Sequence, residues 1–278
     1  MKRSAGPFGF EFVPGETFLS SPTALVVALV LYVVIWTRLS KAYGIAPRGT
    51  SDPAILARRE FYKPILLFHN AFLSLWSIVM FGGLLFAYFS QFLEETSLAT
   101  LFTTIVCDQN YRVWQKLQFW LYIFYISKIY EFGDTFLLCF TMRKVIPLHW
   151  IHHILTLVIT WGGMYSTHSV MAIAMLFNTG VHVIMYAYYA YRIVNPNYFA
   201  WWKKYLTTIQ MVQFVLNLIG LAIWTYMEYS LGMDCAGEAW LAVAVFLVMV
   251  IFLALFAAFA KKTYCKKLKH GTDAVGQG

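Results

Sequence analysis

The stretch AWLAVAVFLVMVIFLALFAAFA, residues 239–260, runs for 22 residues without a charged side chain. About 20 consecutive apolar residues allow an α-helix to cross the hydrocarbon core of a bilayer. The rest of the chain follows the same trend, since 60% of its 278 residues are apolar and only 12% are charged. This composition leaves too little polar surface for a soluble globular protein, and it predicts a polytopic membrane protein.

Further apolar runs precede this stretch, and together they predict an all-α polytopic membrane protein with seven transmembrane helices. The expected spans are 22–38, 64–90, 117–142, 146–166, 169–191, 205–230 and 239–260. No linker rich in Pro, Gly or Ser divides them, so we expect a single membrane domain over 1–278. Its parts are an N-terminal segment (1–20), the seven-helix region (21–260) and a basic tail (261–278).

The positions of the basic residues predict the orientation in the membrane. Short cytosolic loops of membrane proteins carry an excess of lysine and arginine. Most of the 21 basic residues of this chain fall in the first, third and fifth connections and in the tail. We therefore expect a lumenal N-terminus and a cytosolic C-terminus. The net charge of +8 mainly reflects this topology and does not point to nucleic acid, although a basic cytosolic rim would also attract a phosphate-rich substrate.

The four cysteines do not form a metal-binding pattern, because none belongs to a CxxC pair. Cys107 and Cys235 both fall in loops on the predicted lumenal side. An oxidising compartment permits a disulfide there. From the residues alone, a Cys107–Cys235 bond and two free thiols remain alternatives.

Polar residues interrupt three of the predicted spans at helical spacing. The segments are KIYEFGDT (128–135), HWIHH (149–153) and NTGVHVIMYAYY (178–189). Ionisable side chains are costly inside a bilayer and usually serve a function there. These clusters are therefore the candidate functional site.

The first segment places Lys128, Glu131, Asp134 and Thr135 three or four residues apart, on one helix face. We expect Lys128 to be neutralised by Glu131 or Asp134, because an unpaired buried charge costs far more than a paired one. Neutralisation explains how such a helix can insert. It does not explain why the charges are present.

The second segment places His149, His152 and His153 on one face at the predicted cytosolic end of its span. Three imidazoles at a membrane boundary indicate a function. The lone His69 is expected to be a structural histidine. His69, His168 and His270 are also unsuitably placed for a metal site.

The fifth and sixth spans add further polar groups. The residues that share a face are Asn178, His182, Met185, Tyr186 and Tyr189 in the fifth span and Thr207, Gln210 and Gln213 in the sixth. Tyrosines near a membrane end often form an interfacial belt, and amides often join helices. Contact with a polar ligand is the alternative, and the position of His182 deep in its span favours a functional role.

Two kinds of chemistry suit these residues. Imidazoles bind iron or zinc, and HxxHH is similar to the boxes of membrane di-iron enzymes, but those enzymes use about eight histidines and this chain has seven in all. The other option is acyl transfer. An oriented histidine can attack a thioester, and a second imidazole or an amide can stabilise the enolate that forms when malonyl loses carbon dioxide.

The motifs resemble those of the very-long-chain fatty acid elongases, the condensing enzymes of the endoplasmic reticulum membrane. The patterns KxxExxDT, HxxHH, NxxxHxxMYxYY and TxxQxxQ occur here in the order and spacing of that family, across about residues 58 to 262. The resemblance implies that spans two to seven surround a long acyl tunnel with a lumenal cap. It also implies condensation of long-chain acyl-CoA with malonyl-CoA to 3-ketoacyl-CoA, without a cofactor or metal.

The same resemblance implies roles for individual residues. His152 would be the nucleophile of a ping-pong cycle, His182 would assist it, and His149 and His153 would orient the site. The amides of Asn178, Gln210 and Gln213 would hold the thioester. The further substrate contacts expected are Lys128, Glu131, Asp134, Thr135, Tyr186 and Tyr189, with Lys203, Lys204 and Lys262 near the CoA phosphates. A Cys107–Cys235 disulfide also has a counterpart in the family.

The sequence HWIHH is similar to the motif of the elongase branch that acts on saturated and monounsaturated acyl chains. Pro147 departs from the family, in which a large apolar residue is usual before the box, and the ending GTDAVGQG lacks a dilysine retrieval signal. Expected partners are membrane lipid, the ketoacyl reductase, dehydratase and enoyl reductase of the cycle, and a second copy of the chain. A di-iron desaturase or hydroxylase and a solute transporter are the alternative functions.

Overall fold

The computed structural model describes residues 6–47, 49–198 and 201–265. Within these residues the regular structure is helical and contains no strand. The α-helices are α1 (Pro22–Tyr43), α2 (Pro53–Glu94), α3 (Leu98–Val106), α4 (Arg112–Tyr130), α5 (Phe132–Phe140), α6 (Pro147–Tyr165), α7 (Ser169–Val194), α8 (Lys203–Tyr229) and α9 (Ala239–Ala260). A 3-10 turn (Pro7–Gly9) precedes them, and a π-helical turn (Lys261–Cys265) extends α9.

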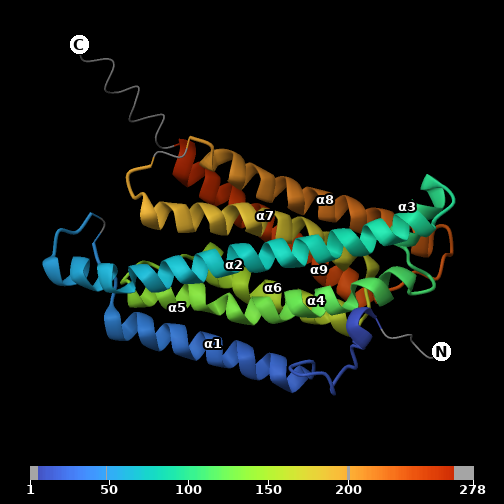
Figure 1. Cartoon of the computed structure of the whole chain (residues 1–278), viewed down its shortest axis with the longest axis horizontal. Helices are drawn as coiled ribbons and strands as arrows, with labels where there is room; N and C mark the ends of the chain where they lie inside the picture. Colours follow the sequence, from blue (N-terminus) through green and yellow to red (C-terminus); the bar gives the residue numbers. More distant parts are fainter. Residues whose placement is uncertain (1–5, 48, 199–200, 266–278) are drawn as a thin grey trace, which may run out of the picture.

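The long helices lie side by side in one bundle, and the 3-10 turn that precedes α1 lies at the opposite end from the end of α9 (Figure 1). Consecutive long segments alternate in direction. We call the end with α3 and the loop after α8 the disulfide end. We call the other end, with residues 44–47, 49–52, 141–146, 195–198 and 201–202, the basic end. The loops therefore divide into the two groups that the charge distribution predicts. Most of the expected tail, 266–278, lies outside the described residues.

In the part of the chain that the structure describes, five helices are long and apolar enough to cross a membrane, namely α1, α2, α7, α8 and α9 with its extension. Their lipid-facing character is visible in exposed apolar side chains such as Val30 in α1, Phe86 in α2 and Val243 in α9. A soluble protein rarely leaves so many apolar side chains in contact with water. The chain is therefore a multi-pass membrane protein. Helices α4 and α6 have 19 residues each and are less uniformly apolar, because they carry polar clusters.

Prolines start three of the helices. Pro22, Pro53 and Pro147 occupy the first turn of α1, α2 and α6, where the missing N–H is not needed. Ser21 and Asp52 cap the first two by accepting the N–H groups of Ala24 and Ala54. Pro147, the departure from the family pattern, thus marks the start of the helix that carries the histidines.

The run 117–142 is not one uninterrupted helix, so this part of the sequence prediction is wrong. Helix α4 ends at Tyr130, and α5 begins at Phe132. At the junction the Asp134 N–H donates to the Glu131 carbonyl at 3.0 Å, which is a tighter, three-residue turn. Gly133 lies against α2, since a Cβ atom there would be 3.0 Å from Cε1 of His69. The break thus brings α5 close to α2.

A disulfide between Cys107 and Cys235 joins the end of α3 to the loop between α8 and α9. The backbone around it is also paired, since the Ala236 N–H donates to the Cys107 carbonyl at 2.7 Å. The Ser169 hydroxyl donates to the Val106 carbonyl at 2.6 Å. These contacts close the disulfide end around the start of α7.

Loss of this disulfide should lower the free energy of unfolding by about 2–4 kcal/mol, because the crosslink restricts the unfolded chain. Cys107→Ser, Cys235→Ser and the double variant should melt at the same reduced temperature, because each removes the same single bond. Tryptophan fluorescence melting in detergent measures this, with dithiothreitol on the native chain as a further comparison. A double variant destabilised by the sum of the single effects would contradict the prediction.

Two buried ionisable side chains at the disulfide end have altered pKa values. His168 is 1% exposed, and burial lowers its pKa to about 4. Its ring packs against Trp224 at 4.6 Å and against Gly237, where a Cβ atom would come within 2.7 Å of the ring. Burial raises the pKa of Asp108 to about 6, although its carboxylate accepts the N–H groups of Val113 and Trp114.

The two groups should oppose each other when the pH falls from 7 to 5. His168 stays neutral in the folded chain but gains a proton in the unfolded chain below about pH 6.5, so its stabilising contribution is lost between 6.5 and 4. Asp108 gains its proton earlier in the folded chain, so its contribution is present at low pH and is lost as pH rises through about 6.

The His168→Gln variant should therefore become more stable relative to the native chain by about 2 kcal/mol on acidification from pH 7 to 5. Asp108→Asn should show the reverse change. Thermal melting of both variants and the native chain across this range measures the two contributions separately. Parallel pH profiles for His168→Gln and the native chain would show that His168 does not remain neutral in the fold.

Candidate active site

The polar segments of α4, α5, α6 and α7 meet inside the bundle. The buried side chains there include Lys128 at 1%, Glu131 at 2% and His182 at 4% exposure. His149, His152, Asn178 and Asp134 are partly exposed. Because these helices are separated in the chain, one connected group of polar side chains depends on their packing.

Lys128 forms an ion pair with Glu131, at 2.8 Å between Nζ and Oε1. The ammonium also donates to the Asn178 side-chain oxygen at 3.2 Å and lies 4.1 Å from the centre of the Phe124 ring. The sequence spacing allowed Glu131 or Asp134 as the partner of Lys128, and in the structure the partner is Glu131. His182 continues the group, with Nδ1 3.6 Å from the same Glu131 oxygen.

Asp134 connects three helices. Its Oδ1 lies 2.8 Å from Nε2 of His69 in α2, and its Oδ2 accepts the Tyr186 hydroxyl of α7 at 2.8 Å. His153 of α6 lies 4.0 Å from Oδ2. The sequence predicts a structural role for His69 but not this partner, and the close approach of α2 and α5 brings its ring onto the Asp134 carboxylate.

Thr135 is fully buried and contacts His149, with 2.9 Å between Oγ1 and Nε2. The same Oγ1 lies 2.9 Å from the hydroxyl of Tyr32 in α1. The first helix therefore reaches the histidine cluster. This contact could not be predicted from the sequence, since a single tyrosine in the apolar run 22–38 is not a distinctive signal.

The three histidines of α6 lie together, as their spacing predicts. The ring of His153 is 4.6 Å from that of His149 and 5.7 Å from that of His152. His149 makes the hydrogen bond to Thr135, and His153 is buried with Nδ1 unpaired among the described residues. His152 is partly exposed, its side chain has no hydrogen-bond partner among the described residues, and its ring lies 5.0 Å from Phe252 of α9. His152 is the imidazole that remains available for a ligand.

Other predicted site residues lie outside this group. Tyr189 is 43% exposed, and the centre of its ring lies 6.2 Å from that of Tyr186. Gln210 donates to the Met185 sulfur at 3.6 Å, and Gln213 is buried in α8. Lys203 and Lys204 begin α8 and Lys262 follows α9, so the three lysines share the basic end.

The side chains can therefore bind, polarise and exchange protons with a polar ligand. Imidazoles act as nucleophiles and as general acids or bases, and the paired Lys128 and Glu131 keep the surrounding charge balanced. Within residues 6–47, 49–198 and 201–265, no cluster of three or more His, Cys, Asp or Glu side chains has the arrangement of a metal site. Cys139 faces α1, since its sulfur donates to the Trp36 carbonyl at 3.7 Å.

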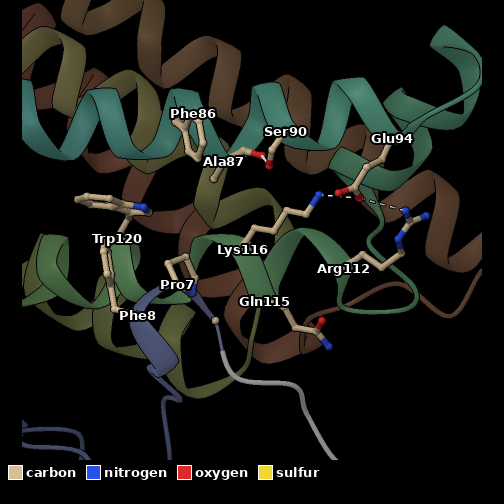
Figure 2. Close-up of a pocket in the computed structure, with 11 residues that line it drawn as sticks. Pro7, Phe8, Phe86, Ala87, Ser90, Glu94, Arg112, Gln115, Lys116 and Trp120 are labelled. Carbon is tan, nitrogen blue, oxygen red and sulfur yellow. Dashed lines mark hydrogen bonds and ion pairs between the residues drawn. The ribbon is translucent and has the colours of Figure 1, made fainter.

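A pocket of about 490 Å³ lies elsewhere, between α2, the N-terminal half of α4 and the turn at Pro7 (Figure 2). Arg112 and Lys116 point into it and both pair with Glu94, at 3.3 and 2.7 Å. Trp120 and Phe8 form its apolar side. This pocket is separate from the histidines, so it is not the acyl tunnel expected beside them.

Comparison with known proteins identifies the family. Residues 17–272 match the family described as "ELO: GNS1/SUR4 family". The chain is 31% identical to the fatty acid elongase sre1 of Dictyostelium discoideum over 260 residues, which is 92% of this chain and 88% of that protein. It is also 31% identical to the very long chain fatty acid elongase 6 of Mus musculus over 223 residues, 78% of this chain and 79% of that protein.

No solved structure is significantly similar to this chain. The family match covers the whole helical bundle and includes every residue of the polar group, from Tyr32 to Tyr186. The chain therefore belongs to the ELO: GNS1/SUR4 family, and it is a membrane-embedded fatty acid elongase.

Proposed function

We propose that the chain condenses long-chain acyl-CoA with malonyl-CoA and releases 3-ketoacyl-CoA, carbon dioxide and CoA, as a very-long-chain 3-oxoacyl-CoA synthase. The observation that carries this proposal is the position of His152 in the histidine cluster, where its side chain is partly exposed and has no hydrogen-bond partner among the described residues. A nucleophile must be accessible and uncommitted. The residues around it supply imidazole, amide and hydroxyl groups, and the proposed reaction uses no cofactor or metal.

In the first step, a nitrogen of His152 attacks the thioester carbonyl. The N–C bond forms and the C–S bond breaks, and the proton lost from the imidazole is taken up by the departing CoA thiolate. His182 contributes by assisting this proton movement, and its Nδ1 is held near Glu131 at 3.6 Å. The product is an acyl-imidazole, which remains reactive because imidazole is a good leaving group.

In the second step, malonyl-CoA loses carbon dioxide, and the electron pair of the broken C–C bond forms an enolate. The enolate carbon attacks the acyl group, the new C–C bond forms, the C–N bond breaks, and His152 regains a proton from water. Asn178 and the imidazoles of His149 and His153 would stabilise the enolate oxygen. The overall reaction consumes one proton.

The proposed architecture has seven spans, with α4 and α5 counted as one. Helices α2 and α4–α9 would surround an acyl tunnel that runs from His152 toward the disulfide end. Met164 and Trp224, which are 0% and 1% exposed, are suitably buried to close it, whereas Tyr165 is 44% exposed and faces outward. Met164 lies three turns beyond His152 on α6, about 18 Å along the axis.

In this proposal the basic end faces the cytosol and the disulfide end faces the lumen of the endoplasmic reticulum. The disulfide supports that assignment, because such bonds persist in oxidising compartments. Lys203, Lys204 and Lys262 then lie where they can attract the CoA phosphates, with Tyr189, Gln210 and Gln213 nearer to that end. The product requires a ketoacyl reductase, a dehydratase and an enoyl reductase to complete the cycle. The expected saturated and monounsaturated substrates, and dimer formation, belong to the same proposal.

The direct test is incorporation of labelled malonyl-CoA by membranes that carry the chain. With long-chain acyl-CoA, label should appear in 3-ketoacyl-CoA together with one equivalent of released carbon dioxide. Membranes without the chain provide the background. Absence of incorporation across acyl-CoAs from short to very long would remove the proposal.

A further inference from the structure

Tyr32 is the point at which α1 enters the polar group. Only Leu25 and Tyr32 are buried among the residues of α1, and Tyr32 is 1% exposed. Its ring stacks on Phe132 at 4.1 Å between centroids. The other side chains of α1, except Leu25, are exposed or partly exposed, and Tyr32 carries the hydroxyl that enters the polar group.

Three groups form a chain of two hydrogen bonds. The Tyr32 hydroxyl lies 2.9 Å from Thr135 Oγ1, and Thr135 Oγ1 lies 2.9 Å from Nε2 of His149. Neither hydroxyl has another hydrogen-bond partner among the described residues. The direction of each bond therefore follows from counting the hydrogens that need an acceptor.

A neutral imidazole has one N–H group and one acceptor nitrogen, whereas each hydroxyl has a single hydrogen. If Tyr32 donates to Thr135 and Thr135 donates to Nε2 of His149, both hydroxyl hydrogens have acceptors. If His149 donates from Nε2 instead, either the Tyr32 or the Thr135 hydrogen is left without an acceptor. In either direction one of the three hydrogens has no protein acceptor. In the first direction that hydrogen is on Nδ1 of the partly exposed His149, whereas in the second it is on a hydroxyl of Tyr32 or Thr135, which are at most 1% exposed. An unsatisfied buried donor costs about 1–3 kcal/mol, so the first direction is favoured.

From this arrangement we infer that Tyr32, acting through Thr135, holds His149 in the tautomer that carries its proton on Nδ1. Nε2 of His149 is then an acceptor and is occupied, and Nδ1–H is a donor that no described residue accepts. His149 is partly exposed and lies 4.6 Å from the His153 ring, inside the polar group. Tyr32 and Thr135 are positioning residues in this scheme.

The inference assigns a role to His149 within the proposed condensation and rests on that proposed function. A fixed Nδ1–H can donate to the thioester oxygen or to the enolate oxygen, where negative charge develops. The same nitrogen cannot act as a base or nucleophile while it carries that proton. Through Tyr32 and Thr135, helix α1 would thus make His149 a hydrogen-bond donor, while His152 remains the nucleophile.

The tautomer can be measured without any assay of activity. The native chain, labelled with ¹⁵N-histidine and reconstituted in lipid nanodiscs, should show an unprotonated Nε2 and a protonated Nδ1 for His149. Comparison with His149→Gln identifies the signals. A protonated Nε2 in the native chain would overturn the inference, whatever the enzyme's reaction proves to be.

Kinetics provide the second measurement. Tyr32→Phe should lower kcat by about tenfold, since it removes one hydrogen bond worth about 1.4 kcal/mol, and it should leave the KM for acyl-CoA unchanged. Thr135→Val should lower kcat at least as much, and Thr135→Ser should restore it because the hydroxyl is kept. In Tyr32→Phe the His149 signals should become a mixture of both tautomers.

Tyr125→Phe is the matched control. Tyr125 is also 1% exposed, and its hydroxyl donates to the Leu19 carbonyl at 2.8 Å, outside the histidine cluster. This variant loses the same atom and one part-buried hydrogen bond, and it should retain native kcat. Equal kcat in Tyr32→Phe, Thr135→Val and the native chain would overturn the inference.

The two proposals fail in different ways. If the native chain does not incorporate malonyl-CoA, the proposed function falls, while the ¹⁵N spectrum still decides the direction of the hydrogen bonds. If Tyr32→Phe does not fold, the comparison of Thr135→Ser with Thr135→Val and the native spectrum decide the outcome. Equal activity of Thr135→Ser and Thr135→Val would then count against the inference.

Discussion

Replacement of His152 by alanine or glutamine is expected to reduce malonyl-CoA incorporation on the order of 10³-fold or more, because loss of a nucleophile removes the covalent route. His168→Gln is the matched control. It likewise exchanges an imidazole for an amide, but this ring is buried at the disulfide end, against Trp224. It should retain turnover when equal amounts of folded protein are compared.

The covalent step can be separated from the rest of the reaction by omitting malonyl-CoA. Mixing the native chain with acyl-CoA alone should release up to one equivalent of free CoA, and peptide mass spectrometry should find the acyl group on His152. His152→Gln should release none. Release of CoA only in the presence of malonyl-CoA would favour direct attack of the enolate on the thioester, with His152 as a binding residue.

The largest effect on stability is expected at the ion pair between Lys128 and Glu131. Both side chains are at most 2% exposed, so removal of one leaves the other as an uncompensated buried charge. Lys128→Met should lower the free energy of unfolding by about 3–5 kcal/mol, and Glu131→Leu should have a similar effect. Melting in detergent, followed by tryptophan fluorescence, measures both.

The double variant Lys128→Met/Glu131→Leu tests the physical cause. It removes both charges, so it should recover most of the lost stability, since a buried ion pair is often replaceable by apolar residues of similar volume. It should not recover activity, because Asn178 and His182 lose the groups that position them. A double variant less stable than either single variant would show that the charges act independently.

The exposed pair of Glu60 and Lys63 provides the reference for this experiment. Its ion-pair distance is 3.2 Å and its spacing is also i,i+3, but the side chains are 71% and 41% exposed. Lys63→Met should change stability by less than about 1 kcal/mol, because water solvates the remaining carboxylate. The contrast with Lys128→Met isolates the contribution of burial.

Much of the fold could be predicted because helix formation and membrane insertion depend on local composition. The apolar runs predict the helices, and the predicted sides of the loops correspond to the two ends of the bundle. The element boundaries were less accurate. Helix α2 begins at Pro53, well before the start of the predicted span at residue 64, because an amphipathic helical segment precedes the apolar run. The break at Glu131 was missed because the polar residues there also fit a continuous helix.

Within the candidate site, pairs on one helix followed from sequence spacing. His149 and His153, or Lys128 and Glu131, are neighbours because the repeat of 3.6 residues per turn places them on one face. The resemblance to elongases supplied the remaining assignments and was confirmed by the family match. The roles of the individual site residues remain predictions.

What the sequence determined by itself was therefore the helices, their polar faces and the family, all of which depend on residues close together in the chain or on matching motifs. Only the tertiary structure decided that His69 contacts Asp134 and that Tyr32 contacts Thr135. Those contacts join residues 65 and 103 positions apart. They depend on how each helix is rotated about its axis and how closely it approaches its neighbours, and helical periodicity within one segment does not contain that information.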